Sequence, residues 1–162
     1  MGCVSCRPRG ERGFTLVELV AIVVLIAILA FSAIPRYQDQ GAIDVSAKAG
    51  QLANDIRYTQ SLAMTTGQHN YITLTATPPS YQIFTGSGTP VVHPATGSSA
   101  AIALGSVSLS TTNASIAFDA KGIPYNGAAG AALSTPATIT LSEGGSTRTV
   151  TVSPQTGRVA VP

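Results

Sequence analysis

Residues 14–34 read FTLVELVAIVVLIAILAFSAI, an apolar run that decides how the rest of the chain is organised. Only Thr15, Glu18 and Ser32 in this run are polar. As an α-helix the run would be about 31 Å long, which matches the hydrocarbon core of a bilayer. The sequence therefore predicts an apolar helix long enough to span a membrane, with one carboxylate, Glu18, near its start.

Positive charge precedes the apolar run. Arg7, Arg9 and Arg12 lie within the first dozen residues, against a single acid, Glu11. Cytoplasmic flanks of membrane helices carry an excess of Lys and Arg. We therefore expect the N-terminal tail to stay in the cytoplasm and everything after Pro35 to lie across the membrane.

Three kinds of segment fit this pattern. A cleaved secretory signal has an apolar core of about 7–15 residues and then a small-residue cleavage site, whereas this run is longer and ends in Ala30–Ala33, a poor site. A passive membrane anchor leaves Glu18 unexplained, because a charge inside a membrane helix costs about 2.5–3.5 kcal/mol and is a functional-site hypothesis by default. The third kind is indicated by the residues that precede the run.

The string RGFTLVEL at 12–19 resembles the class III leader junction of type IV prepilins and type II secretion pseudopilins. The resemblance consists of a small residue, an aromatic residue, a glutamate four positions later, the apolar run, and then a proline with a charged and aromatic pair. These are Gly13, Phe14, Glu18, residues 19–34, Pro35 and Arg36-Tyr37. Several independent features coincide, so the resemblance is specific.

The resemblance implies roles for four of these residues. A prepilin peptidase cuts after Gly13 and methylates the new amine on Phe14, and the apolar helix is kept. Glu18 then pairs with the Phe14 amine of a neighbouring subunit during filament assembly. These roles are physically reasonable, because glycine lets a peptidase approach the bond closely and a buried carboxylate needs a partner. Pro35 lacks an N–H and clashes with the preceding turn, so we expect a helix kink there.

Residues 36–66 continue in a helical pattern. Apolar residues follow one another three, four or seven positions apart along one stripe, which consists of Val45, Ala49, Leu52, Ile56 and Ala63. Asp55 and other polar residues are expected on the opposite side, and Gly67 is a stop signal. We therefore divide the chain into a leader at 1–13, a membrane and assembly half-helix at 14–35, an amphipathic half-helix at 36–66 and a β-rich head at 67–162. The two halves are predicted to form one long helix.

After Gly67 the apolar period changes from 3.6 to 2, which predicts strands. Two hairpins are expected, from 71–75 with 81–84 and from 137–141 with 147–152. Weaker strands are expected at 102–109, 114–118 and 158–161, a turn at 119–122 and a loop at 126–136. Because the amphipathic stripe must be buried, it should pack on these strands. The predicted fold is α+β, and the resemblance implies the type IV pilin-like arrangement of a long N-terminal helix on an antiparallel sheet.

Two further segments are similar to the GspH/FimT group of minor pilins and pseudopilins. The first lies at the end of the helix and consists of Leu52, Asp55, Arg57, Gln60, Leu62 and Ala63. The second lies in the head and consists of Phe118, Asp119, Gly122, Pro124, Ile139, Leu141, Arg148, Val150, Val152, Pro154, Thr156, Gly157 and Val159.

The sequence shows no constellation for catalysis, a cofactor or a metal. Cys3 and Cys6 form a single C-x-x-C, half of a zinc site at best, and leader cleavage would remove both. His69 and His93 have no clustered acids beside them and are expected to be loop histidines. A P-loop, a nucleophile elbow and a calcium loop are all absent. We therefore predict a protein that is not an enzyme and needs no cofactor.

Charge gives little support for nucleic-acid binding. Three of the nine basic residues lie in the leader, so the remaining chain is nearly neutral. Lys121, Arg148 and Arg158 could gather near the last hairpin and contact DNA phosphates, which need clustered cations. Three residues make a thin patch, and isolated solvated side chains are the simpler interpretation.

The predicted function is that of a minor pilin, a structural subunit of a type IV pilus. The alternatives are a minor pseudopilin of type II secretion and a pilus-associated DNA-binding subunit in natural transformation. The resemblance implies four partners: the prepilin peptidase, other pilin or pseudopilin subunits, the inner-membrane assembly platform and, before assembly, the lipid bilayer. It also implies a single-pass protein of the bacterial inner membrane with its head in the periplasm, later found in a pilus or pseudopilus.

Overall fold

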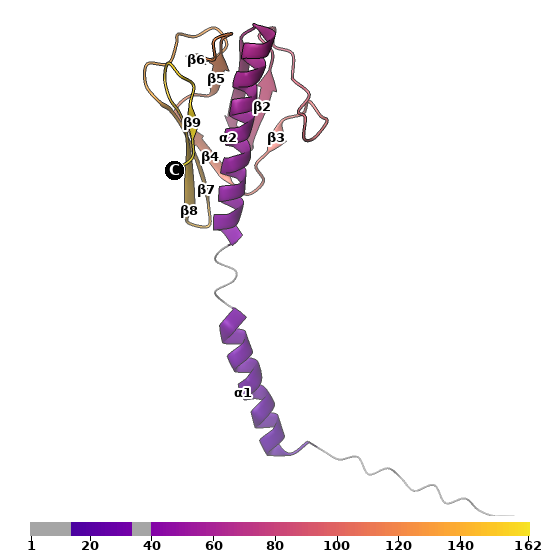
Figure 1. Cartoon of the computed structure of the whole chain (residues 1–162). Coiled ribbons are helices and arrows are strands. Elements are labelled where there is room, and N and C mark those ends of the chain that lie inside the picture. The colour runs from indigo at the N-terminus through magenta and orange to yellow at the C-terminus, as the bar shows by residue number, and fades with distance from the viewer. Residues whose placement is uncertain (1–13, 34–39) are drawn as a thin grey trace, which may run out of the picture. The chain divides into compact units, whose positions relative to one another are not determined.

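The computed structural model describes residues 14–33 and 40–162, and the chain divides into two compact units (Figure 1). The first unit contains helix α1 (Leu16–Ala33). The second, which we call the head, contains helix α2 (Gln40–Thr66) and all the strands. Cys3, Cys6, Gly13 and Pro35 lie outside the described residues, so the predictions made for them, including the kink and a continuous helix, remain predictions.

Within the described residues, no helix reaches the combination of length and apolarity that crossing a membrane requires.

The strands of the head form two antiparallel sheets. Sheet A has the order β3-β2-β1-β5-β6, with β1 (Asn70–Ala76), β2 (Pro79–Phe84), β3 (Ile102–Ala103), β5 (Ser115–Phe118) and β6 (Pro124–Asn126). Sheet B has the order β4-β7-β8-β9, with β4 (Ser108–Thr111), β7 (Ala137–Glu143), β8 (Ser146–Val152) and β9 (Val159–Ala160). The α+β prediction is confirmed.

Both predicted hairpins are present. Strands β1 and β2 pair from Tyr71 with Phe84 to Ala76 with Pro79. Strands β7 and β8 are joined by Gly144 and Gly145, whose φ angles are 57° and 85°. A two-residue hairpin loop of this kind needs positive φ at both positions, which glycine adopts at little cost.

Helix α2 is the element around which the head packs. The predicted stripe is fully buried and shares one core with side chains from both sheets. Figure 1 shows α2 running along the head with strands on both of its sides. The helix ends where predicted, because the Gly67 N–H donates to the Ala63 carbonyl at 3.0 Å and Gly67 has a φ of 67°.

The buried sector of α2 is wider than the predicted stripe. Ala53 and Asp55 are also buried, and at about 100° per residue they lie about 80° on either side of Val45. The prediction that Asp55 decorates the polar side is wrong. The reason is that two sheets flank the helix and cover more of its circumference than the apolar stripe alone indicates.

The region after β2 also differs from the prediction. Residues 102–109 are not one weak strand, because they supply β3 to sheet A and the start of β4 to sheet B. The predicted loop at 126–136 begins inside β6 and carries a bridge from Ala132 to Tyr125. These pieces are too short to carry a visible period of two.

Side-chain hydrogen bonds tie the second half of α2 to the β5–β6 turn, to the C-terminal turn and to β9. Nε2 of Gln60 donates to the Gly122 carbonyl at 2.9 Å and to the Thr156 carbonyl at 3.2 Å. The Arg57 guanidinium donates to the Val159 carbonyl at 3.0 Å. All five residues belong to the two segments that resemble the GspH/FimT group, so that pattern describes a contact between α2 and the strands and turns of the head.

Gly157 lies at the centre of this contact, so a substitution at this position tests how close the contact is. Its φ is 64°, and an added Cβ would overlap Nε2 of Gln60 and lie 2.6 Å from the Gly122 carbonyl oxygen. Gly157→Ala should therefore lower the free energy of unfolding by about 3 kcal/mol or more, as strain and overlap combine. Gly127→Ala is the matched control, because Gly127 has a φ of 79° with open space around its Cβ position. It should cost only about 1–2 kcal/mol.

The measurement is urea unfolding of the full chain in mild detergent. Equal losses for the two variants would mean that the crowding at Gly157 is not real.

Candidate functional site: the assembly helix and the head

The first turn of α1 is held by Thr15. Its Oγ1 accepts the Glu18 N–H at 3.3 Å, and its carbonyl accepts the Leu19 N–H at 3.1 Å. Thr15 is therefore the N-cap and Glu18 occupies the third helical position, as in a capping box. A carboxylate here is also stabilised by the helix dipole. Glu18 thus has a local structural role, and the Thr-x-x-Glu spacing of the sequence already contains this signal.

The surface of α1 is apolar and uncovered. Its large apolar side chains that the structure describes are between 42% and 80% exposed, from Ile22 to Leu16. Glu18 is exposed as well, and Phe14 just before the helix is 73% exposed. Exposed apolar surface on this scale marks an interaction site. The structure therefore places the predicted site residues Phe14 and Glu18 together, at the start of an uncovered apolar helix.

A second polar constellation, which the sequence did not predict, lies inside the head. Asp55 of α2 is buried and accepts a hydrogen bond from the Tyr81 hydroxyl at 2.6 Å. The other Asp55 oxygen lies 2.8 Å from Nε2 of His93. These two contacts give a partner to each oxygen of the Asp55 carboxyl group, which makes its burial tolerable.

His93 attaches the connection between β2 and β3 to the helix. The Ala95 N–H points at Nδ1 of His93 at 3.3 Å, so the ring proton lies on Nε2 and is donated to Asp55. The backbone N–H of His93 donates to the Ser98 carbonyl at 2.9 Å. His93 is a loop residue, as predicted, but only 6% of it is exposed. It therefore acts as a buried anchor for this loop.

The sequence gives one weak signal for this cluster. No Asp, Glu, Lys or Arg occurs between Arg57 and Asp119, so β1, β2, β3 and the loops that connect them contain none of these residues. A carboxylate partner for Tyr81 or His93 must therefore come from another part of the chain. What the sequence does not reveal is the distance in space between Asp55, Tyr81 and His93.

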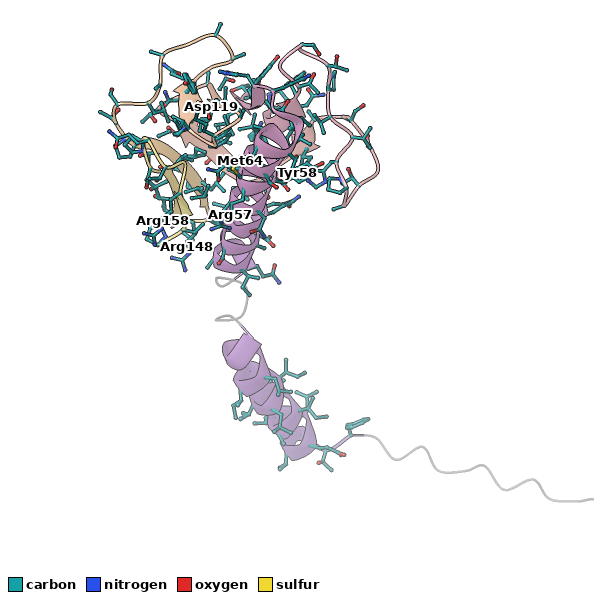
Figure 2. The ribbon with its side chains drawn as sticks, turned by 45° about the horizontal axis from the view of Figure 1, so that its top comes forward. Arg57, Tyr58, Met64, Asp119, Arg148 and Arg158 are labelled. Carbon is teal, nitrogen blue, oxygen red and sulfur yellow. The ribbon has the colours of Figure 1, made fainter. Side chains whose placement is uncertain are left out.

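The three cations considered for DNA binding do not gather in one place. Lys121 follows Asp119 in a turn whose Gly122 contacts Gln60. Arg148 instead lines a groove together with Ala47 of α2. Ala47 lies 13 residues before Gln60, which is about 20 Å along the helix axis. Figure 2 shows Asp119 and Arg148 toward opposite ends of the head.

Arg148 and Arg158 are also separated along sheet B. The Arg158 carbonyl accepts a hydrogen bond from the Ser153 N–H, so Arg158 lies beside Ser153. Arg148 lies five residues before Ser153 in the chain. At about 3.3 Å per residue this is roughly 17 Å.

Among the residues that the structure describes, no group of three or more His, Cys, Asp or Glu side chains is placed to hold a metal ion.

The buried cluster generates a prediction about alkaline pH. Burial, together with the hydrogen bond to Asp55 and its charge, raises the pKa of Tyr81 well above its ordinary value of 10.0. The folded head keeps the phenol proton while the unfolded chain loses it near pH 10. The resulting stability is present below pH 10 and falls by about 1.4 kcal/mol per pH unit above it.

Tyr81→Phe should lower the free energy of unfolding by about 1–3 kcal/mol at pH 7, because Asp55 loses a donor. It should also remove the Tyr81 contribution to the alkaline slope. Tyr125→Phe is the control, since its hydroxyl lies 3.4 Å from Asp119 in a half-buried position, and it should change neither quantity appreciably. Urea unfolding from pH 7 to pH 11 measures both, and an unchanged slope for Tyr81→Phe would contradict the assignment.

Comparison with protein families gives two matches. The family described as type II transport protein GspH matches residues 48–156. The prokaryotic N-terminal methylation motif matches residues 8–34. The first range contains most of α2 and the rest of the head down to the C-terminal turn. The second range contains the leader junction and α1.

Individual relatives agree with these matches. Two fimbrial proteins of Pseudomonas aeruginosa are each 53% identical over 34 residues, which is 21% of this chain. The match spans 22% of the length of those relatives. The type IV minor pilin FimU of Pseudomonas aeruginosa, solved in two crystal forms, has the same fold with TM-scores of 0.52 and 0.51. The identities are 17% and 15%, over 75% and 72% of this chain and 90% and 91% of FimU.

Proposed function

Because the chain belongs to the family of type II transport protein GspH, we propose that it is a minor pilin, a structural and non-enzymatic subunit of a type IV pilus. In this proposal a prepilin peptidase cuts after Gly13 and methylates Phe14. The new subunit waits in the inner membrane with its head in the periplasm. The assembly platform then moves it into the filament, where α1 packs against other subunits.

One observation carries this proposal. Helix α1, which lies within the range matched by the methylation motif, exposes apolar side chains around its whole circumference and has Glu18 in its first turn. Such a surface needs a cover of lipid or protein. A segment of this kind, followed by a head of the GspH family, fits a subunit that exchanges a bilayer for a filament.

The second candidate is a minor pseudopilin of type II secretion. The description of the family that matches residues 48–156 favours it, whereas the fold of the minor pilin FimU agrees with the pilus. Both candidates use the same processing and the same helix. Shearing separates them, because a pilus subunit is released from the cell surface with the filaments and a pseudopilus subunit stays in the cell envelope.

DNA binding has less support than either. Lys121, Arg148 and Arg158 are spread over the head, and nucleic-acid phosphates are bound by clustered cations.

Gly13→Leu should block processing, because a side chain at this position hinders the peptidase. The uncleaved precursor should accumulate in the membrane, as seen by immunoblot of membrane fractions. Gly10→Leu is the control, since it adds the same side chain to the leader away from the junction. If Gly13→Leu matures like the unaltered chain, the junction is not at Gly13.

Glu18→Ala should be inserted and cleaved but enter filaments poorly, because the α-amine of a neighbour loses its partner. Part of any effect could come from helix stability, so Thr15→Ala serves as the control. It removes the cap, which is worth about 1 kcal/mol, and leaves the carboxylate. The measurement is the ratio of subunit in sheared filaments to subunit in membranes. Equal ratios for Glu18→Ala and the unaltered chain would exclude an assembly role for Glu18.

A further inference from the structure

A groove lies beside the first turns of α2. It is lined by Ala42, Ile43, Ser46 and Ala47 of the helix and by Arg148 of β8, and its volume is about 630 Å³. A smaller pocket of about 190 Å³ adjoins it and shares Ala42 and Arg148, with Ser146 and Thr147 as its other walls. We call these two hollows together the Arg148 groove.

The backbone explains why the groove is there. Gly41 lies so close to the β7–β8 hairpin that an added Cβ would be 3.2 Å from the Glu143 carbonyl oxygen. The helix therefore starts against the hairpin. The next side chains on the open side of the helix are small, except Ile43, and they leave the space in front of Arg148 unfilled.

Arg148 occupies an unusual position for a cation. It is paired with Leu141 across the sheet, so its side chain is on the same face as the buried Leu141 and Val150. It is nevertheless exposed, because the first turns of α2 do not cover it. Its guanidinium takes part in none of the ion pairs or side-chain hydrogen bonds found among residues 14–33 and 40–162.

The groove also carries apolar surface. Ile43 is 65% exposed, which is more than any other large apolar side chain described in the head. Uncovered apolar surface is thus present on both sides of residues 34–39, on α1 and on the first turns of α2. Filament assembly would therefore have apolar side chains to cover in each of the two units, on α1 and at the start of α2.

We propose that the Arg148 groove receives a neighbouring filament subunit, through a segment that presents small or apolar side chains and one carboxylate. The proposal rests on the proposed function of a filament subunit. The apolar part of that segment covers Ile43, and its carboxylate accepts a bidentate pair of hydrogen bonds from Arg148. Arginine is frequent among the residues that dominate interface energies, because its planar group matches a carboxylate.

A phosphate polymer fits the groove less well. Nucleic acids bind where several cations cluster, and among the lining residues that the structure describes Arg148 is the one cation. The apolar side chains of the groove would gain nothing from phosphates. One cation beside Ile43 and two alanines fits a protein segment better.

Site-specific crosslinking in the native host tests the proposal. A photo-crosslinking residue replaces Ser46 in the full chain. The matched control carries it at Ser61, which is also an exposed serine of α2 and lies about 22 Å further along the helix. We expect an adduct with another pilin-family subunit from position 46 and at most a weak one from position 61.

Charge reversal then tests the role of Arg148. In the Ser46 crosslinking chain, Arg148→Glu should reduce the adduct at least about tenfold, and Arg158→Glu should leave it unchanged. Ile43→Asp changes an exposed side chain with little risk to folding, and it should also weaken the adduct. Incorporation into sheared filaments is measured in the same samples.

The outcomes separate the two proposals. If the crosslinking chains enter filaments but position 46 gives no more adduct than position 61, or if Arg148→Glu leaves the adduct unchanged, the groove proposal is overturned. If the unaltered chain is found in neither filaments nor a pseudopilus, the proposed function itself fails and the groove proposal falls with it.

Discussion

The head depends on the burial of one helix, α2, over a wide sector of its surface. A helix that packs on one sheet has a single face covered. Here two sheets flank α2, and Asp55 is buried together with the apolar residues. Burying that carboxylate requires donors from elsewhere in the chain. Tyr81 and His93 supply them, so a strand of sheet A and the loop after it are held to α2 by the same group. At the other side of the helix, Gln60 holds the β5–β6 turn and the C-terminal turn, and Arg57 holds β9.

Helix α1, unlike α2, is not buried by the rest of the described chain. Its apolar side chains find no cover within the described part of its own chain, although covering one of them fully is worth about 1.5–3 kcal/mol. A helix with this surface is stable only where lipid or protein surrounds it. The apolar side chains of the head cover one another in one core, whereas those of α1 need lipid or another protein chain to cover them. In the proposed function, this division lets the chain be held in the membrane first and assembled into a filament later.

The sequence predicted those features that have a local signature. The spacing of Val45, Ala49, Leu52 and Ile56 predicted the buried stripe, and Gly144-Gly145 between alternating residues predicted the last hairpin. The burial of Asp55 could not be predicted in this way, because its partners lie 26 and 38 residues away. Strand β3 is two residues long and has no period to recognise.

For the same reason, the sequence predicted the residues at the leader junction but not the Arg148 groove. The pattern around Gly13, Phe14 and Glu18 is contiguous in sequence, so it was visible at once. The Arg148 groove joins the start of α2 to β8, more than 100 residues later. Only the folded head brings those two segments together.

The central claim is that the chain is processed at its leader and keeps its apolar helix as an assembly element. The most direct test is the mass of the mature chain isolated from membranes and from sheared filaments. We expect one species that begins at Phe14 and carries a single methyl group on its N-terminal amine. A mature chain that begins after the apolar run, or a precursor that is never cleaved, would contradict it.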